Sequence, residues 1–211
     1  MELHWNILDK KRLDILPLLQ QVVGGGFYLA GDTGLALQIG HRDSIDFDFF
    51  LNQDFDTKDI ARHIESVFLK HEVAFIQEEK DTISCTIDGT VQLSFLSYYY
   101  PLQKPLIVTE FFPIASVEDI GCMKLSAITG RSVEKDYVDL YFILQQLPLA
   151  ELLAVSSHKH PSLNVNLILK SLVYFDDVVK EPLIYKEGNE TSFETIKAYM
   201  QKSVAQYVNV H

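Results

Sequence analysis

Hydrophobic positions in the first half of the chain change their spacing several times, which indicates short helices and strands in alternation. Apolar residues before residue 26 follow a helical period, and three glycines then end that stretch. Pro17 lies inside it and predicts a kink or a new helix start. A second helix is predicted to begin after Asp56-Thr57 and to run to about residue 70. Strands are predicted at 27–30, 44–51, 73–77, 82–87 and 91–98.

Turn residues separate several of these elements. Asp88-Gly89 is a strong hairpin signal between the last two strands. Residues 31–34 have the composition of a turn, and we expect a brief helix at 35–39 to follow it. These assignments predict a meander of three strands joined to an earlier strand–turn–strand segment.

The second half of the chain is almost entirely helical in pattern. Helices are predicted at about 117–129, 134–146, 149–157, 162–175 and 192–207. Thr191 and Glu194 form a capping-box pattern for the last helix, whereas His158 and His160 are expected in a solvated loop. The pattern changes near residue 115 without a linker. We therefore predict an α+β domain at 1–115 and a helical C-terminal domain at 116–211 that packs against it.

Composition places the chain among ordinary globular proteins. Its 211 residues are 47% hydrophobic and 22% charged, so a sizeable core and little disorder are expected. No apolar run reaches the ~20 residues that span a bilayer, and the first residues lack the pattern of a signal peptide. Cys85 and Cys122 are too few for a disulfide framework or a zinc site. We expect a cytoplasmic protein with no membrane association.

The charge balance argues against one class of function. Eighteen basic and 29 acidic residues give a formal net charge of −11. A protein that coats nucleic acid by general attraction to phosphate is usually basic, so that class is disfavoured. The surplus of carboxylates is compatible with binding of divalent cations, although solubility alone also accounts for it.

The strongest chemical signal is the pair Asp46 and Asp48 in the strand predicted at 44–51. Alternate residues of a strand point to the same side and lie about 6.6 Å apart, so Ile45, Phe47 and Phe49 take one face and the two aspartates the other. Two carboxylates placed in this way can bind Mg²⁺, which prefers oxygen ligands and leaves room for substrate phosphates. The alternative is that both aspartates lie on the solvent-facing side of an edge strand.

The segment that begins at Gly31 offers a second part of such a site. A turn led by glycine that opens a short helix presents backbone N–H groups and, through Thr33, a hydroxyl to a phosphate. An ordinary turn without any ligand is the competing interpretation.

Two motifs carry a resemblance to a known family. The run FYLAGDTGLALQIGHRDSIDFDFF and the later run DIGCMKLSAITGRSVEKDYVDLYFIL resemble, in the same order, the motifs of the AbiEii/AbiGii-type nucleotidyltransferase toxins. This family lies within the polymerase-beta-like nucleotidyltransferase superfamily. The matching positions are Gly31, Thr33, His41, Arg42, Ser44, Asp46, Asp48, Phe49, Phe50, Lys124, Arg131, Lys135, Asp136 and Asp139.

The resemblance implies a fold, a reaction and a set of roles. The fold is a nucleotidyltransferase-like mixed sheet with flanking helices and the Asp pair on a central strand, followed by a C-terminal helical bundle. The reaction is Mg²⁺-dependent transfer of a nucleoside monophosphate from an NTP to a hydroxyl of RNA, tRNA being one candidate, or of a protein. A cognate antitoxin is the implied partner. Asp46 and Asp48 would bind the metal, Gly31, Thr33, Arg42, Ser44 and Lys124 the nucleotide, and Asp136 would act as the base or assist the metal.

Two positions depart from the family pattern. Asp32 replaces the second small residue of the glycine turn, where a carboxylate would repel a triphosphate unless a metal intervened or the side chain turned away. Ser94 aligns with the third carboxylate that superfamily enzymes usually carry, and a hydroxyl cannot replace that base. Both departures favour a first alternative, a nucleotide-binding protein with the same fold that has lost catalysis. A second alternative is a protein-interaction module whose acidic face binds a basic partner.

Several roles also have structural alternatives. Arg42 could bind phosphate, since its planar fork matches an oxyanion, or it could support the fold by pairing with Asp43 or Asp46. Lys124 could bind β/γ-phosphate oxygens as a point charge. The competing interpretation for the later motif is a surface ladder of salt bridges among Lys124, Glu134, Lys135 and Asp136.

Overall fold

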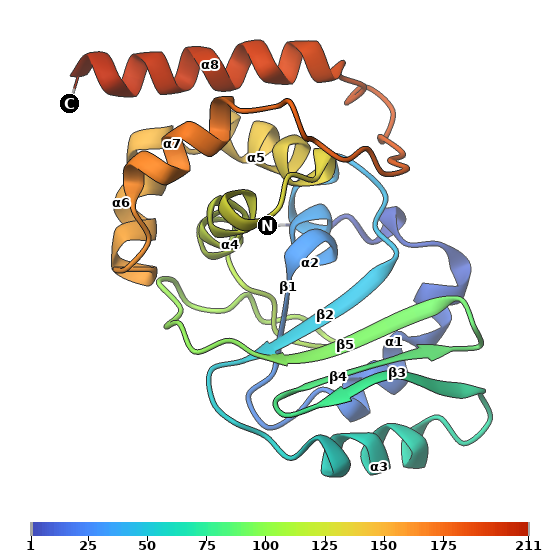
Figure 1. The fold of residues 1–211 in the computed structure, drawn as a ribbon. Coiled ribbons are helices and arrows are strands. Elements are labelled where there is room, and N and C mark those ends of the chain that lie inside the picture. The colour runs from blue at the N-terminus through green and yellow to red at the C-terminus, as the bar shows by residue number, and fades with distance from the viewer. Residues whose placement is uncertain (1, 211) are drawn as a thin grey trace. The chain divides into compact units, whose positions relative to one another are not determined.

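The computed structural model describes residues 2–210, and these residues pack as two compact units. The first unit comprises Met1–Pro101 and Pro105–Ser116, and the second comprises Leu102–Lys104 and Val117–His211 (Figure 1). The short segment Leu102–Lys104, which the sequence assigned to the first domain, groups instead with the helices of the second unit.

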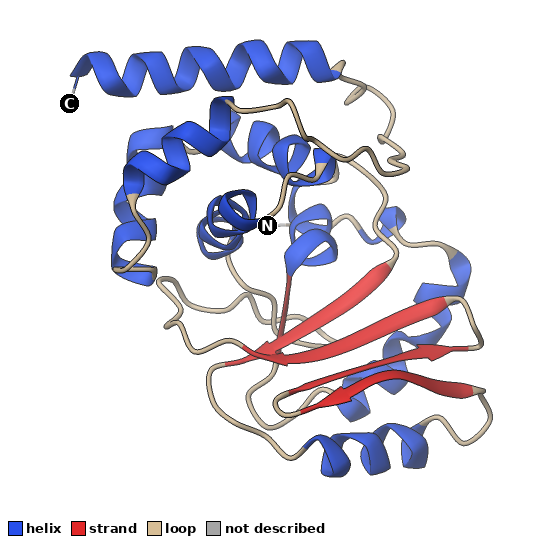
Figure 2. Cartoon of the chain, viewed as in Figure 1, coloured by secondary structure: helices blue, strands red, loops and turns tan. Residues whose placement is uncertain are grey.

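A five-stranded mixed sheet is the centre of the first unit (Figure 2). Its order is β1-β2-β5-β4-β3, in which only the β2–β5 pair is parallel. The strands are β1 (Tyr28–Ala30), β2 (Asp46–Leu51), β3 (Val73–Glu79), β4 (Thr82–Ile87) and β5 (Val91–Ser97). Positive φ angles at Asp88 and Gly89 form the tight β4–β5 turn that the sequence predicted. The predicted α+β class is confirmed.

One face of this sheet is apolar and forms the core of the unit. Phe47 and Phe49 on β2 point to it together with Leu93 and Phe95 on β5, and all four are fully buried. Helices α1 (Lys10–Val22) and α3 (Thr57–Val67) contribute their apolar side chains to the same cluster. The strong period-2 pattern of β2 is explained by this burial, because only its odd-numbered residues face the helices.

Local capping fixes where these helices begin. The Asp9 side chain accepts a hydrogen bond from the Arg12 N–H at the start of α1, and Asp56 accepts one from Lys58 N–H at the start of α3. The helix α2 (Gly31–Ile39) ends at Gly40, whose φ of 70° is the left-handed conformation that favours glycine. A short 3₁₀ turn, η1 (Trp5–Ile7), precedes α1.

The second unit consists of helices. They are α4 (Val117–Gly130), α5 (Glu134–Gln146), α6 (Leu149–Lys159), α7 (Val165–Val173) and α8 (Phe193–Val210). Helix α4 is surrounded by α5, α6 and α7, and α8 lies against α5, α6 and α7. Within residues 2–210 no single helix has the length and apolar character of a membrane span, and only the sharply bent pair α5–α6 passes that test jointly.

The structure corrects several local predictions. Helix α1 continues across Pro17, so no new helix starts there, and the alternative of a kink stays a prediction. Helix α2 begins at Gly31, so residues 31–34 are its first turn and not a separate loop. Ile45 precedes β2 and is 57% exposed, so it does not share the buried face of Phe47. Ser192, and not Thr191, caps α8 by accepting a hydrogen bond from Thr195 N–H. Apart from Pro17, which lies inside α1, these differences concern the ends of elements, where local sequence signals are weakest.

Candidate active site

Asp46 and Asp48 lie on the face of the sheet opposite the phenylalanine core. Both side chains are half-buried, whereas Phe47 between them is fully buried. Strand β2 is paired with β1 on one side and with β5 on the other. It is therefore an internal strand, and the edge-strand interpretation of the two aspartates is wrong. Carboxylates held in this way on an internal strand form a localised concentration of negative charge.

The start of α2 approaches this pair closely. Gly31 has a φ of 63°, and a Cβ at this position would lie 3.4 Å from Asp48 Oδ2. A larger residue would adopt a strained backbone here, and its Cβ would be in van der Waals contact with the carboxylate. The backbone conformation therefore favours glycine, and it brings the N-terminal end of a helix next to the acidic strand.

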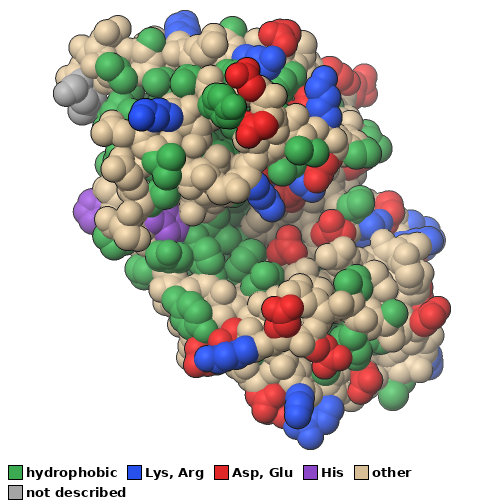
Figure 3. All heavy atoms as spheres, viewed as in Figure 1, with side chains coloured by type: hydrophobic (Ala, Val, Ile, Leu, Met, Phe, Trp, Pro, Cys, Tyr) green, Lys and Arg blue, Asp and Glu red, His purple; other side chains and the backbone are tan. Residues whose placement is uncertain are grey.

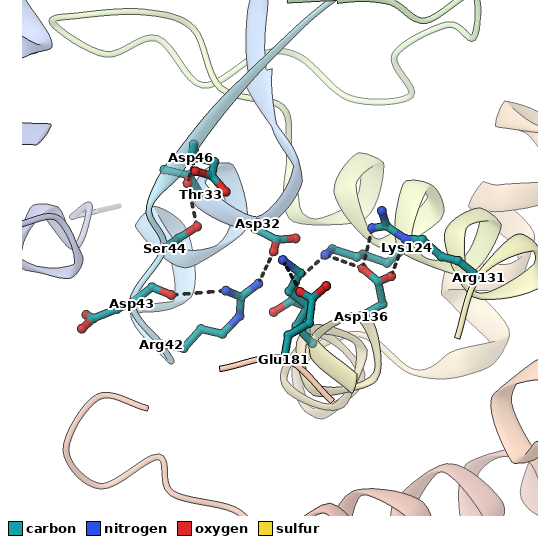
Figure 4. Close-up of polar contacts among 12 residues, drawn as sticks. Asp32, Thr33, Arg42, Asp43, Ser44, Asp46, Lys124, Arg131, Asp136 and Glu181 are labelled. Atoms are coloured by element: carbon teal, nitrogen blue, oxygen red, sulfur yellow. Dashed lines mark hydrogen bonds and ion pairs between the residues drawn. The ribbon is translucent and has the colours of Figure 1, made fainter. Parts of the chain in front are cut away.

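The hydroxyls of Thr33 and Ser44 connect α2 with the residues before β2. The two oxygens lie 2.7 Å apart, and Thr33 also donates a hydrogen bond to the carbonyl of Asp46 (Figure 4). Both side chains are buried. The structure therefore places these two predicted phosphate ligands in a buried connection that positions Asp46.

Arg42 resolves the problem posed by the extra carboxylate at Asp32. Its guanidinium Nη2 lies 3.0 Å from Asp32 Oδ2, and its Nη1 donates a hydrogen bond of 3.2 Å to the backbone carbonyl of Asp43. Figure 4 shows the guanidinium between these two groups. Arg42 is buried, so this pairing compensates the Asp32 charge within the first unit. Arg42 thus supports the fold through an ion pair with Asp32, which the sequence did not predict, and through the backbone carbonyl of Asp43.

Ser94 stands where the sequence alignment placed it. In the parallel β2–β5 pair its Cα is the direct partner of Asp48, so its side chain lies on the same face as the two aspartates. It is 5% exposed. The position that would carry a third carboxylate is therefore adjacent to Asp48, and this chain has a hydroxyl there.

The later motif forms a buried charge cluster in the second unit. Lys124 Nζ lies 2.8 Å from Asp136 Oδ1 and 2.6 Å from Asp139 Oδ2, and Arg131 donates hydrogen bonds to both oxygens of Asp136. Both aspartates are fully buried. The surface-ladder interpretation is wrong for Lys124 and Asp136. Lys135 does form a more exposed pair, 2.7 Å from Glu181.

A second buried ion pair was missed by sequence reasoning. Lys159 Nζ lies 2.7 Å from Asp119 Oδ1, and both side chains are completely inaccessible to solvent. Asp119 also accepts hydrogen bonds from the backbone N–H groups of Gln103 and Lys104, which fastens the segment Leu102–Lys104 to α4. The prediction of a solvated loop at 158–160 is wrong, because His158 and Lys159 belong to α6.

His160 follows directly after α6 and is buried as well. Burial, aided by the neighbouring charge of Lys159, lowers the pKa of His160 to about 4. Burial also raises the pKa of Cys85 and of Cys122 to about 12, so neither thiol is an activated nucleophile.

The donor set on β2 fits a divalent cation that shares its coordination with a substrate. Within the part of the chain that the structure describes, no three or more His, Cys, Asp or Glu side chains converge as a metal-binding group. Asp46 and Asp48 supply two hard carboxylate donors that are partly accessible to solvent, and Gly31 places no side chain next to Asp48. Two carboxylates with open positions are the arrangement in which Mg²⁺ binds together with phosphates and water.

Comparison with known proteins agrees with this geometry. The sequence matches the family model described as nucleotidyl transferase AbiEii toxin, type IV TA system, over residues 18–188. It is 36% identical over 200 residues to the uncharacterized protein aq_aa25 of Aquifex aeolicus (strain VF5), and the match covers 90% of this chain and 94% of that protein.

Solved structures share the fold. MenT4, a nucleotidyltransferase toxin of Mycobacterium tuberculosis H37Rv, has a TM-score of 0.64 at 15% identity, covering 92% of this chain and 80% of its own. A Helicobacter pylori protein to which nucleotidyltransferase activity is provisionally ascribed has a TM-score of 0.57 at 17% identity, with coverages of 97% and 99%. The predicted nucleotidyltransferase-like fold is confirmed by both. The chain belongs to the AbiEii family of nucleotidyl transferase toxins of type IV toxin–antitoxin systems.

Proposed function

We propose that this protein is a Mg²⁺-dependent, cytoplasmic nucleotidyltransferase that transfers a nucleoside monophosphate from an NTP to a hydroxyl group of RNA, with tRNA as the first candidate. The acceptor oxygen forms a bond to the α-phosphorus, the bond from that phosphorus to the β-phosphate bridge breaks, and pyrophosphate leaves. Family membership implies an NTP substrate, a divalent metal and a cognate antitoxin. The choice of Mg²⁺, of RNA as acceptor and of the cytoplasm is our proposal.

The Asp46–Asp48 pair is the observation that carries the proposal. Two half-buried carboxylates share one face of an internal strand, next to a helix start that glycine keeps open. These side chains would hold Mg²⁺, whose charge would offset the negative charge that develops on the transferring phosphoryl group. Thr33 and Ser44 would keep Asp46 in place through their buried hydrogen bonds.

Nucleotide binding is assigned to the same segment and to Lys124. The backbone at Gly31 lies beside Asp48, where it could approach a phosphate bound with the metal. Thr33, Arg42, Ser44 and Lys124 are all hydrogen-bonded within the protein, so direct contact with the triphosphate requires them to exchange or share a partner. Their part in nucleotide binding stays a prediction.

Asp136 is our candidate for the group that accepts the proton from the acceptor hydroxyl. Lys124 and Arg131 together donate three hydrogen bonds to its two oxygens. Little of its acceptor capacity is left for a proton while both cations stay in place. Movement of Arg131, whose side chain is 57% exposed, is the simplest way to free one of these oxygens.

The test is transfer of label from NTP to RNA. The protein is mixed with each α-labelled NTP, Mg²⁺ and total RNA, and label in RNA is measured for the wild type, Asp46→Asn and Asp48→Asn. We expect labelled RNA with the wild type and a rate of labelling that is lower by about 100-fold or more in each variant. The reason is that a bound metal ion lowers the activation free energy of such a step by several kcal/mol. Undiminished transfer in both variants would contradict the assignment of the metal site.

Ser94 supports a second candidate function, that of a nucleotide-binding protein without catalysis. A serine beside Asp48 leaves the pair without a third carboxylate on β5. Ser94→Asp should then tighten metal binding and create or raise the transferase rate. Ser84→Asp is the matched control, because Ser84 lies on β4 directly opposite Ser94 and one strand further from Asp48. Metal-dependent NTP binding in a wild type that never labels RNA would favour this candidate.

A pure interaction module has less support. Figure 3 shows acidic and basic side chains interspersed over the visible face, with no single acidic field on that face for a basic partner. Absence of any NTP binding in the calorimeter would be the result that favours it.

A further inference from the structure

The second unit contains an open cavity in which the proposed reaction places no part of either substrate, although Arg131 in its wall also contacts Asp136. Its volume is about 630 Å³, within the range of small-molecule sites, and its lining comes from the end of α4, the α4–α5 connection, α7 and the segment after α7. Every lining residue belongs to the second unit. The residues that matter to the argument are Arg131, Tyr137, Leu167, Lys170, Val173 and Tyr174.

Hydrogen bonds hold the walls of this cavity in place. The Tyr137 hydroxyl lies 3.0 Å from the carbonyl of Ser171 and 3.2 Å from that of Tyr174, so it fixes the end of α7. On the other side Val179 N–H donates to the carbonyl of Ser132, and Glu134 N–H donates to that of Val179. The cavity is thus formed before any ligand arrives, which lowers the entropic cost of binding.

One wall is apolar and unusually exposed. Leu167 is 46% exposed, Val173 is 37% exposed and Tyr174 is 51% exposed, although all three line the cavity. An exposed tyrosine flanked by aliphatic side chains presents the flat surface on which a nucleobase stacks. The wall therefore favours a planar aromatic group over a compact polar one.

The polar part of the lining is cationic on balance. Arg131 and Lys170 are both solvent-accessible, against a single lining carboxylate at Asp177. Asp136 lies beside Arg131, but it is also held by Lys124 at 2.8 Å, so a phosphate can share the Arg131 guanidinium without leaving Asp136 unpaired. Arginine and lysine beside a stacking surface are typical of sites that bind a nucleotide.

A cavity in the first unit shows the contrast. It has a volume of about 400 Å³ and carries Asp54, Asp56 and Asp59 in its lining, with no arginine or lysine. Three carboxylates would repel a phosphate. The aromatic side chains of this cavity are Phe27 and Phe55, so the arginine and lysine side chains, and not the aromatic ones, distinguish the cavity of the second unit from it.

From this arrangement we infer that the cavity beside Arg131 and Tyr174 is a second nucleotide site, which binds one nucleotide with its base on Tyr174 and its phosphate between Arg131 and Lys170. The bound nucleotide is either a free nucleoside monophosphate or one unit of a single-stranded RNA. This inference does not depend on the proposed reaction, because it needs neither metal nor transfer.

The experiment first disables metal binding at Asp46 and Asp48 and then tests nucleotide binding in the cavity of the second unit. Asp46→Asn protein in EDTA is titrated with AMP in a calorimeter and with a labelled single-stranded RNA by fluorescence anisotropy. Tyr174→Ala or Lys170→Ala, made in this background, should weaken binding of at least one probe by about tenfold, the order expected for loss of one stacked base or one phosphate contact. Tyr174→Phe should retain binding, since the ring and not the hydroxyl supplies the contact.

Two exposed residues of the same types serve as controls. Tyr100→Ala and Lys202→Ala remove a tyrosine and a lysine that do not line this cavity, and they should leave both affinities unchanged. Loss of AMP affinity identifies a free-nucleotide site, and loss of RNA affinity identifies an RNA subsite. Absence of binding by both probes, or equal affinity in the cavity and control variants, would overturn the inference. Neither result depends on whether Asp46→Asn abolishes metal-dependent NTP binding, which tests the proposed function.

Discussion

The aspartates of the two units lie in opposite surroundings. Asp46 and Asp48 share a strand face, lie two residues apart and keep part of their surface accessible to solvent. Asp119, Asp136 and Asp139 are fully buried, and each has a lysine nitrogen within 2.8 Å. These three carboxylates of the second unit thus have buried lysine partners, whereas Asp46 and Asp48 place two like charges side by side on one strand. The same side chain is a structural element in one region and a candidate ligand for an external cation in the other.

The largest expected effect concerns the buried pair of the second unit. Lys159→Met leaves the Asp119 carboxylate enclosed without its counter-ion, so the free energy of unfolding should fall by about 3–5 kcal/mol. Urea unfolding followed by far-UV circular dichroism measures this. Lys10→Met, which breaks the exposed pair with Asp14, is the control and should cost less than about 1 kcal/mol. Equal costs for the two substitutions would show that burial does not distinguish these ion pairs.

The pH dependence of stability should reveal the same enclosed region. Because the pKa of His160 is about 4 in the folded protein, the folded state keeps this side chain neutral where the unfolded chain, with a value near 6.5, binds a proton. Stability should therefore fall as the pH decreases from about 6.5 to about 4, by at most about 3 kcal/mol. His160→Gln should remove that part of the pH dependence, and His158→Gln, on the exposed side of α6, should not. Identical pH profiles for wild type and His160→Gln would contradict the prediction.

Substitution of Lys124 tests whether a residue of the buried charge cluster also binds the NTP. If its ammonium contacts the β/γ-phosphates, Lys124→Met should weaken NTP binding more than NMP binding, by about 1.5–3 kcal/mol for the lost charge-assisted hydrogen bond. Because this variant leaves Asp136 and Asp139 without a lysine, its folding is checked first by circular dichroism. Lys124→Arg keeps the charge and provides a folded alternative for the same titrations. Equal losses for NTP and NMP would assign Lys124 to structure alone.

The smallest effect is expected on the acidic strand of the first unit. Asp48→Asn removes one of two like charges that share a strand face, so without metal the free energy of unfolding should change by less than about 0.5–1 kcal/mol, or increase slightly. The matched substitution Asp119→Asn in the second unit should cost several times more. Comparable destabilisation by both would mean that Asp48, too, is part of the structural framework.

Sequence patterns predicted the elements better than their ends. The period-2 alternation of β2 and the Asp88-Gly89 turn are local signals, and both are present in the structure. The start of α2 at Gly31 was missed because the glycine composition of residues 31–34 resembles a turn. Gly31 lies close to Asp48, 17 residues further along the chain, and local composition cannot reveal such a long-range contact.

The two motifs identified Arg42 and Lys124 as candidate site residues but not Asp32 as the ion-pair partner of Arg42. The Arg42–Asp32 and Lys159–Asp119 pairs could not be predicted from local sequence, because the choice of partner depends on how distant segments meet in the fold. Lys159 nevertheless left a signal in the sequence. Leu149, Leu152, Leu153, Ser156 and Lys159 follow the helical period and form the buried side of α6, so extending that period by one turn places the lysine in the core.

The segment Leu102–Lys104 has a practical consequence for anyone who wishes to isolate either half of the protein. The chain passes between the two units at three places, before Leu102, after Lys104 and before Val117. A fragment that begins at Val117 would leave Asp119 without the backbone donors of Gln103 and Lys104. A fragment that contains the helices must therefore begin at Leu102. It then also includes residues Pro105–Ser116, which belong to the first unit and would be separated from it. A single cut in the gene does not separate the two units.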